Sequence, residues 1–124
     1  MLLPLLMISC LCFAQDVKEI IGKPIKIGNL LVAQFDFPKQ MNWDDAKKAS
    51  TEIGEGWRLP TEDELMILLK NKDKIGGFAN AAYWSSTEEG DVYGAYSISF
   101  PYGTRVRFSK KFKIKRNVRA IKAI

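Results

Sequence analysis

The chain has no histidine, and its only two cysteines, Cys10 and Cys12, lie among the first twelve residues. The absence of histidine removes the commonest general base and the commonest metal ligand of proteins. It also excludes Ser-His-Asp and Cys-His catalytic arrangements. If the segment before residue 15 is removed, the remaining chain has no cysteine, so its hydrophobic core must stabilise it without disulfides.

Acidic residues are absent from the last part of the chain. Residues 92–124 hold nine basic residues and no acid, whereas residues 16–91 hold all 14 acids and ten basic residues. The formal net charge of +5 therefore conceals a negative front part and a positive end. A length of 124 residues, with 47% apolar and 27% charged residues, indicates one globular domain with one core.

An uncharged apolar run occupies residues 2–14. It is too short to span a bilayer as a helix, which takes ~20 residues. It is typical of the apolar part of a secretory signal peptide with cleavage after Ala14, although basic residues before it are missing. One alternative is a lipoprotein site at residues 7–10 with Cys10 lipidated, and another is a core strand. The run predicts a secreted, periplasmic or cell-surface protein.

A helix start follows Pro60, because a proline keeps the residue before it out of helical geometry. Thr61 suits the N-cap, and Glu64 is placed to complete a capping box. Apolar residues then recur at helical spacing at Leu65, Leu68 and Leu69. An earlier helix is predicted from Asn42, with Trp43, Ala46, Ala49 and Ile53 on one face.

The remaining sequence predicts mainly strands and turns. Residues 30–37 and 83–86 favour strands, residues 71–80 a loop, and residues 88–91 a turn. Alternating residues over 96–100 predict a half-buried strand, followed by a returning strand with Val106 and Phe108 on one side. Phe112 and Ile114 alternate with lysines in a further strand, and residues 118–121 close the chain.

Four motifs carry a family resemblance: Trp43 with Ala46, residues 56–65, residues 83–88, and residues 117–122. In this order they resemble the bacterial family that includes the C-terminal domain of the collagen-like adhesin Lcl. The resemblance covers residues 29–124, after a predicted signal peptide over 1–14 and a leader over 15–28. It implies an α+β, C-type-lectin-like fold, related to that of formylglycine-generating enzymes, in which two short helices pack on a twisted, mainly antiparallel sheet.

The basic C-terminal hairpin is the predicted ligand-binding site. In a strand, Arg105 and Arg107 stand about 6.6 Å apart on one face. Lysines 111, 113 and 115 would form a second row, and no acid in this part of the sequence neutralises them. A surface with this concentration of positive charge suits the binding of sulfates, carboxylates or phosphates. The predicted contacts are Tyr102, Arg105, Arg107, Lys110, Lys111, Lys113, Lys115 and Arg116.

Two interpretations of these basic residues stay open. Lysines on the outer face and edge of a sheet also discourage strand-to-strand aggregation, without binding anything. The resemblance favours binding, because it implies a surface for sulfated glycosaminoglycans, although it supplies no residue-level motif.

A second set of residues is predicted to be structural. Arg58 and Arg119 are flanked by apolar residues, and a buried charge needs a carboxylate partner, for which Glu64 is the obvious candidate. Trp43, Trp57 and Trp84 are predicted to lie in the core. The exposed alternative for Tyr83, Trp84 and Tyr102 is stacking against sugars.

No metal, cofactor or catalytic residue is predicted. The spacing of the acidic residues matches no calcium loop, and no pair of acids is singled out for hydrolysis. The sequence thus predicts a non-catalytic binding module for anionic, sulfated or carboxylated polysaccharide. The alternative is an assembly module that binds a protein or itself through its acidic helices and basic hairpin. Nucleic acid is not an expected partner of an exported chain.

Overall fold

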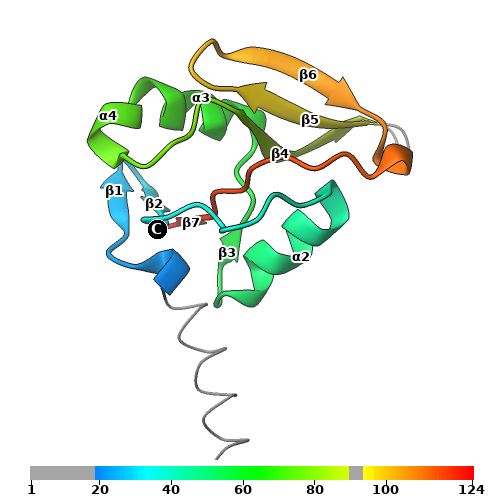
Figure 1. Ribbon diagram of the computed structural model, residues 1–124. Coiled ribbons are helices and arrows are strands. Elements are labelled where there is room, and N and C mark those ends of the chain that lie inside the picture. Colours follow the sequence, from blue (N-terminus) through cyan, green and yellow to red (C-terminus); the bar gives the residue numbers. More distant parts are fainter. Residues whose placement is uncertain (1–18, 90–93) are drawn as a thin grey trace, which may run out of the picture.

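A computed structural model describes residues 19–89 and 94–124 (Figure 1). The predicted signal peptide, its cleavage site and Cys10 lie outside these residues, as do Gly90 and Asp91 of the predicted turn. The elements in chain order are β1 (Ile25–Ile27), β2 (Leu30–Val32), α2 (Trp43–Glu52), β3 (Trp57–Arg58), α3 (Glu62–Lys70), α4 (Lys72–Ile75), β4 (Ala82–Glu89), β5 (Gly94–Ser99), β6 (Thr104–Phe108), the 3₁₀ helix η1 (Lys110–Phe112) and β7 (Ile121–Ala123).

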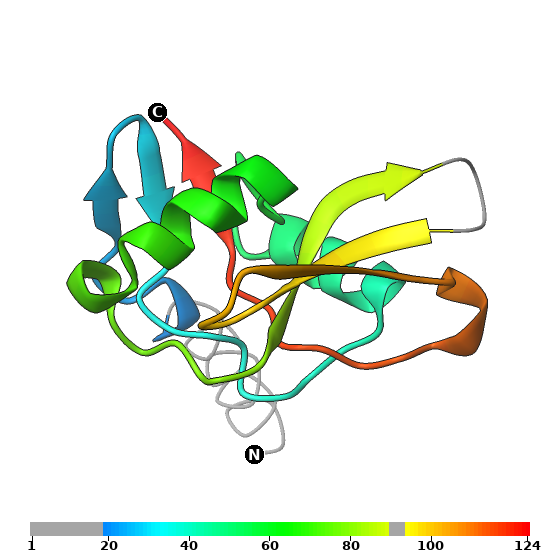
Figure 2. The same cartoon turned by 90° about the horizontal axis from the view of Figure 1, so that it is seen from above.

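The strands in residues 19–89 and 94–124 form two antiparallel sheets, not the one sheet that the sequence predicts. The first has the order β1-β2-β7-β3, so β7 from the end of the chain lies between two strands from its first half. The second is the meander β4-β5-β6, which extends away from the first sheet (Figures 1 and 2). The end of the chain therefore completes a sheet that the first half of the chain begins.

Both faces of the second sheet are covered where β5 runs through it. On one face, Ile98 packs with Leu65 and Leu68 of α3. On the other, Trp84 and Ala95 pack with Trp43 of α2. The prediction that residues 96–100 form a half-buried strand is therefore wrong, because β5 is the central strand and helices lie on both sides of it.

The predicted helix starts are confirmed. Asn42 accepts a hydrogen bond from the Asp45 amide, and α2 begins at the next residue. Thr61 and Glu64 form the complete capping box of α3. These caps satisfy amide groups that the first turn of a helix leaves without partners, so local chemistry alone fixes where both helices begin.

Several other boundaries differ from the prediction. The strand expected over residues 30–37 ends at Val32, and the loop expected over residues 71–80 contains α4. Strand β4 continues through Glu88 and Glu89, which were expected in a turn. In each case pairing with a neighbouring segment or packing against the core decides the boundary, and the sequence pattern does not contain that information.

Among the described residues, three clusters of buried side chains form the core, and each cluster combines residues from the first and the second half of the chain. Trp43, Trp57 and Trp84 are all buried, as predicted. No helix in the described part of the chain is both long and apolar enough to cross a membrane.

Candidate functional site

The basic segment, defined here as residues 105–116, begins on an antiparallel hairpin. Register pairs Ile98 of β5 with Arg105 of β6 and Tyr96 with Arg107, so both arginines lie on the same face, as predicted. Both are exposed, while Val106 between them is partly buried. Tyr102 is 84% exposed in the turn that joins the two strands, so it is available to a partner.

The second row of lysines does not form a strand, and that prediction is wrong. Residues Lys110–Phe112 form η1, whose first turn is capped by the Ser109 hydroxyl. Lys113 follows with a φ of 54°, in the left-handed region. This turn redirects the chain from β6 toward α2, so Lys111, Lys113 and Lys115 do not share one face by strand alternation.

The expectation that no acid neutralises the basic segment is wrong for four of its cations. Glu62 at the start of α3 pairs with Arg105 at 2.6 Å, and Asp44 in the first turn of α2 pairs with Lys113 at 3.2 Å. The end of β4 supplies Glu89 to Arg107 at 3.1 Å and Glu88 to Lys110. The acidic front part and the basic end therefore meet within one molecule.

Two of these four ion pairs are held by further contacts. The Arg105 guanidinium lies 3.9 Å from the centre of the Tyr96 ring, and the side chain of its partner Glu62 is only 16% exposed. The Lys110 side chain is 13% exposed, and its amino group lies 4.3 Å from the centre of the Trp43 ring. Such stacking and burial fix the cations against aromatic faces.

The other two pairs are open to solvent. Lys113 and Asp44 have side-chain exposures of 61% and 56%. Arg107 and Glu89 are similarly exposed, although the Tyr96 hydroxyl, followed by the Arg107 guanidinium, holds the pKa of the Glu89 carboxyl below its usual value. Exposed ion pairs contribute little to stability, because solvent and salt screen the two charges. Arg107 and Lys113 can therefore exchange their partners for another anion.

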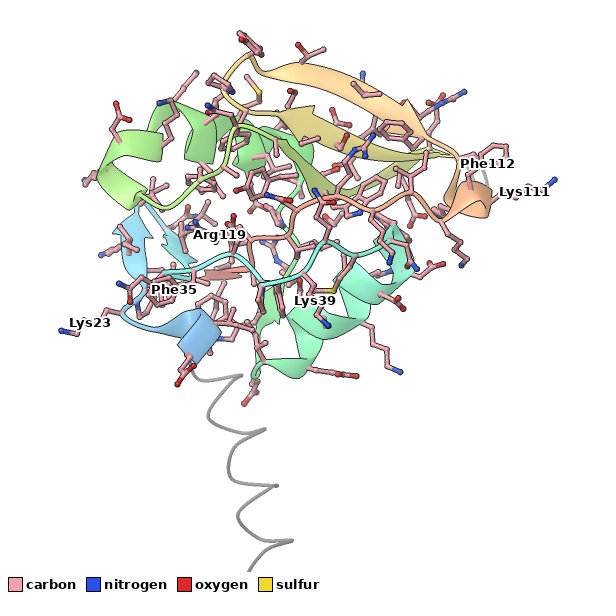
Figure 3. The ribbon with its side chains drawn as sticks, in the orientation of Figure 1. Lys23, Phe35, Lys39, Lys111, Phe112 and Arg119 are labelled. Carbon is pink, nitrogen blue, oxygen red and sulfur yellow. The ribbon has the colours of Figure 1, made fainter. Side chains whose placement is uncertain are left out.

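Three cations of the basic segment have no carboxylate partner among the described residues: Lys111, Lys115 and Arg116. The Arg116 guanidinium lies 4.4 Å from the centre of the Phe108 ring. Arg116 also forms an antiparallel bridge with Met41, which lies two residues after the exposed Lys39; Figure 3 labels the Lys39 side chain.

The predicted structural ion pair of Arg58 is present. Arg58 donates to both carboxylate oxygens of Glu64, at 2.7 and 3.0 Å. This pairing, together with the Thr61 amide, lowers the pKa of the Glu64 carboxyl. Glu64 therefore serves the capping box and the ion pair at once and fixes β3 to the start of α3.

Arg119 has a partner that the sequence did not identify. Its side chain is 0% exposed, and its Nε donates to Asp36 at 2.7 Å. Its two terminal nitrogens, Nη1 and Nη2, donate to the carbonyls of Ala33 and Gly76 respectively. The Tyr83 hydroxyl donates to the other oxygen of Asp36, and burial with this hydrogen bond raises the pKa of Tyr83 to about 12. Tyr83 is therefore a core residue, and the sugar-stacking alternative for it is wrong.

The basic segment lies apart from the two clefts that the described residues form. A cleft of about 690 Å³ lies near Phe35 and Asp36, and one of about 240 Å³ lies between α4 and the residues before β4 and after β5. None of the predicted ligand-binding residues lines either cleft. Among the described residues, no three Asp, Glu, Cys or His side chains come together in a way that could hold a metal ion.

Comparison with known proteins identifies the fold class. No protein-family model matches the sequence, and a search of curated proteins found no match. Among solved structures, the chain is similar to the crystal structure of botrocetin, a C-type-lectin-like protein. The TM-score is 0.54 at 13% sequence identity, and the match covers 82% of this chain and 96% of the botrocetin chain. The predicted α+β, C-type-lectin-like fold is thereby confirmed.

Proposed function

We propose that the chain is a non-catalytic binding module that contacts anionic polysaccharide through its basic segment, without a metal ion. The observation that carries this proposal is the set of three cations, Lys111, Lys115 and Arg116, that have no carboxylate partner in the described part of the chain. A cation without a partner attracts an external anion more strongly than one that is already neutralised.

A linear polyanion fits this surface better than a small ligand does. Small ligands usually occupy concave sites, and the basic segment lines neither of the two clefts described above. A chain of sulfated or carboxylated sugars carries many separated charges and can contact several exposed cations at once. It can also take Arg107 and Lys113 from their exposed carboxylate partners, because those pairs are weak.

The expected contribution of each cation to polysaccharide binding depends on whether it already has a carboxylate partner and an aromatic neighbour. Lys111, Lys115 and Arg116 come first, and Arg107 and Lys113 second. Arg105 and Lys110 come last, because each lies against an aromatic ring and has a carboxylate partner. The sequence alone does not give this order, because it does not show which cations have partners.

Chromatography on immobilised heparin tests the proposal directly. The triple variant Lys111→Gln, Lys115→Gln, Arg116→Gln is expected to elute at clearly lower salt than the unchanged chain. Retention of both proteins decreases with salt, because the Debye length falls to about 8 Å at physiological ionic strength. The matched control removes the same charge elsewhere, through Lys26→Gln, Lys70→Gln and Lys74→Gln on exposed positions of β1, α3 and α4.

If the two triple variants elute together, retention reflects net charge alone and the proposed surface is wrong. If the unchanged chain passes through without retention, polysaccharide binding itself is wrong. Arg105→Gln is expected to change elution less than Arg107→Gln does, since Arg105 is held by Glu62 and Tyr96.

We also propose that the chain is exported. The apolar residues 2–14 and the small residue Ala14 support cleavage at that point. Mass spectrometry of the protein isolated from its cell is expected to give a chain that begins at Gln15. A chain that begins at a lipidated Cys10 would support the lipoprotein alternative, and one that retains residues 1–14 would contradict export.

A further inference from the structure

Phe112 is an apolar side chain that anion binding does not explain. It is 72% exposed on η1, and it belongs to none of the three core clusters. It also takes part in none of the ring-to-ring contacts among the described aromatic residues. The apolar surface of Phe112 stays in contact with water in the free protein, so a partner that covers it would gain the free energy of burying a phenylalanine.

Phe112 has a lysine on each side of it in the chain. Lys111 precedes it and is exposed without a carboxylate partner in the described residues, and Lys113 follows it in an exposed, weak ion pair. Figure 3 shows Lys111 and Phe112 together at the end of the molecule that η1 forms. The segment from Ser109 to Arg116 contains no acid.

The turn that carries Phe112 has a defined shape. The Ser109 hydroxyl accepts from the Lys111 amide, and the Lys113 amide donates to the Lys110 carbonyl. Lys110 lies against Trp43 and pairs with Glu88, which fastens η1 to the body. An aromatic side chain on a fixed turn loses little conformational freedom when it is buried, so its burial is favourable.

We propose that this tip, formed by Lys111, Phe112 and Lys113, docks on an anionic phospholipid surface. Phe112 would enter the boundary between headgroups and acyl chains, which lies about 5–10 Å below the surface. The lysines would contact the negative headgroups, which attract nearby basic side chains. A polysaccharide offers the same negative charge but no apolar layer, so the exposed phenylalanine favours lipid over sugar at the tip. The tip shares Lys111 and Lys113 with the proposed polysaccharide site, but docking on lipid does not depend on polysaccharide binding.

Quenching by brominated lipid tests the position of residue 112 itself. The probe is the full chain carrying Phe112→Trp, mixed with vesicles of phosphatidylcholine and phosphatidylglycerol at a ratio of about 70 to 30. Dibrominated acyl chains are expected to quench the emission that this substitution adds, while the three native tryptophans stay unquenched because they are buried in the core. The unchanged chain, measured in parallel, supplies their signal, so that only quenching of the emission added at residue 112 is counted.

Vesicle sedimentation measures the strength of docking. Phe112→Ser is expected to lower partition onto the anionic vesicles about tenfold, because burial of a phenylalanine is lost. Lys111→Gln is expected to lower it about fivefold on anionic vesicles and not on pure phosphatidylcholine. The matched control is Phe35→Ser, which removes an exposed aromatic side chain at the opposite end of the molecule (Figure 3) and is expected to leave partition unchanged.

If the emission added by Phe112→Trp stays unquenched, the proposal is overturned, and equal partition of the unchanged chain and Phe112→Ser has the same consequence. In that case a protein partner is the remaining occupant for Phe112. Heparin retention separates this inference from the proposed function, because Phe112→Ser is expected to keep the elution salt of the unchanged chain. Loss of heparin retention without loss of vesicle binding would assign the phenylalanine to the polysaccharide surface and overturn the lipid proposal.

Discussion

Two groups of arginine and lysine residues in this protein have the same chemistry and opposite surroundings. Arg119 is completely buried, with Asp36, two backbone carbonyls and the ring of Phe78 as partners. The cations of the basic segment are mostly exposed, and several have no carboxylate partner among the described residues. Burial therefore makes one cation a part of the core, and exposure leaves the others available to a partner.

A carboxylate partner therefore contributes very differently to stability in the two places. A buried charge without its partner is very costly, so Asp36 is required wherever Arg119 is buried. An exposed pair such as Lys113 and Asp44 adds little stability and does not prevent either residue from binding elsewhere. The following changes test how far this contrast holds, from the largest expected effect to the smallest.

Asp36→Ala is expected to destabilise the fold by about 3–5 kcal/mol, because it leaves the buried guanidinium of Arg119 without its counter-charge. Urea unfolding measures the loss. The double variant Asp36→Ala, Arg119→Met is expected to lose less than the sum of the two single losses, because it leaves no charge in the core. Additive losses would mean that the pair does not act as a unit.

Tyr83→Phe is expected to cost about 2 kcal/mol, the contribution of a hydrogen bond to a charged acceptor. It also changes the pH dependence. The folded pKa of about 12 lies above the ordinary value of 10.0, so this stabilisation is complete below pH 10 and is lost as the pH rises toward 12. Absorbance at alkaline pH is expected to show a smaller ionisation step near pH 12 in Tyr83→Phe than in the unchanged chain.

Glu64→Gln is expected to cost about 1 kcal/mol at neutral pH, through a weaker capping box and the lost ion pair with Arg58. The folded pKa of Glu64 is below its ordinary 4.5, so its ionic stabilisation is present above that value and disappears as the pH falls through the folded pKa. Thermal unfolding curves of the two proteins, recorded from neutral to strongly acidic pH, are therefore expected to converge. A constant difference would show that the charge of Glu64 does not matter.

Lys113→Gln is expected to change the unfolding free energy by less than about 1 kcal/mol, because both partners of its ion pair are exposed. Guanidinium unfolding provides the measurement. Lys113→Gly loses the same ion pair, but glycine adopts the left-handed backbone at this position without steric cost. It is therefore expected to be at least as stable as Lys113→Gln. A loss of several kcal/mol in either variant would place this exposed pair in the same category as Arg119 and remove the contrast.

Much of the local structure could be predicted because its causes are local. Asn42, Thr61 and Glu64 cap helices through atoms only a few residues apart, and the arginines of β6 share a face because strands alternate. The burial of the three tryptophans and the need of Arg119 for a carboxylate followed from their apolar neighbours. These features depend on the nearest residues in the chain.

The misplaced features have distant causes. Asp36 was not identified as the partner of Arg119 because 83 residues separate them. The pairing of Arg105 with Glu62 and of Lys113 with Asp44 was missed for the same reason, and it removed much of the expected positive field. Residues 111–115 alternate like a strand in sequence, yet none of the described strands pairs with them, and Lys111 and Phe112 belong to η1 instead.

The sequence by itself determined where the helices start, which tryptophans are buried, and that the end of the chain is rich in positive charge. Only the tertiary structure decided which of those charges are neutralised, because ion pairing falls off over a few ångströms and depends on which distant segments lie next to each other. It also decided that Phe112 stays exposed between lysines, since the core is completed by residues on other elements.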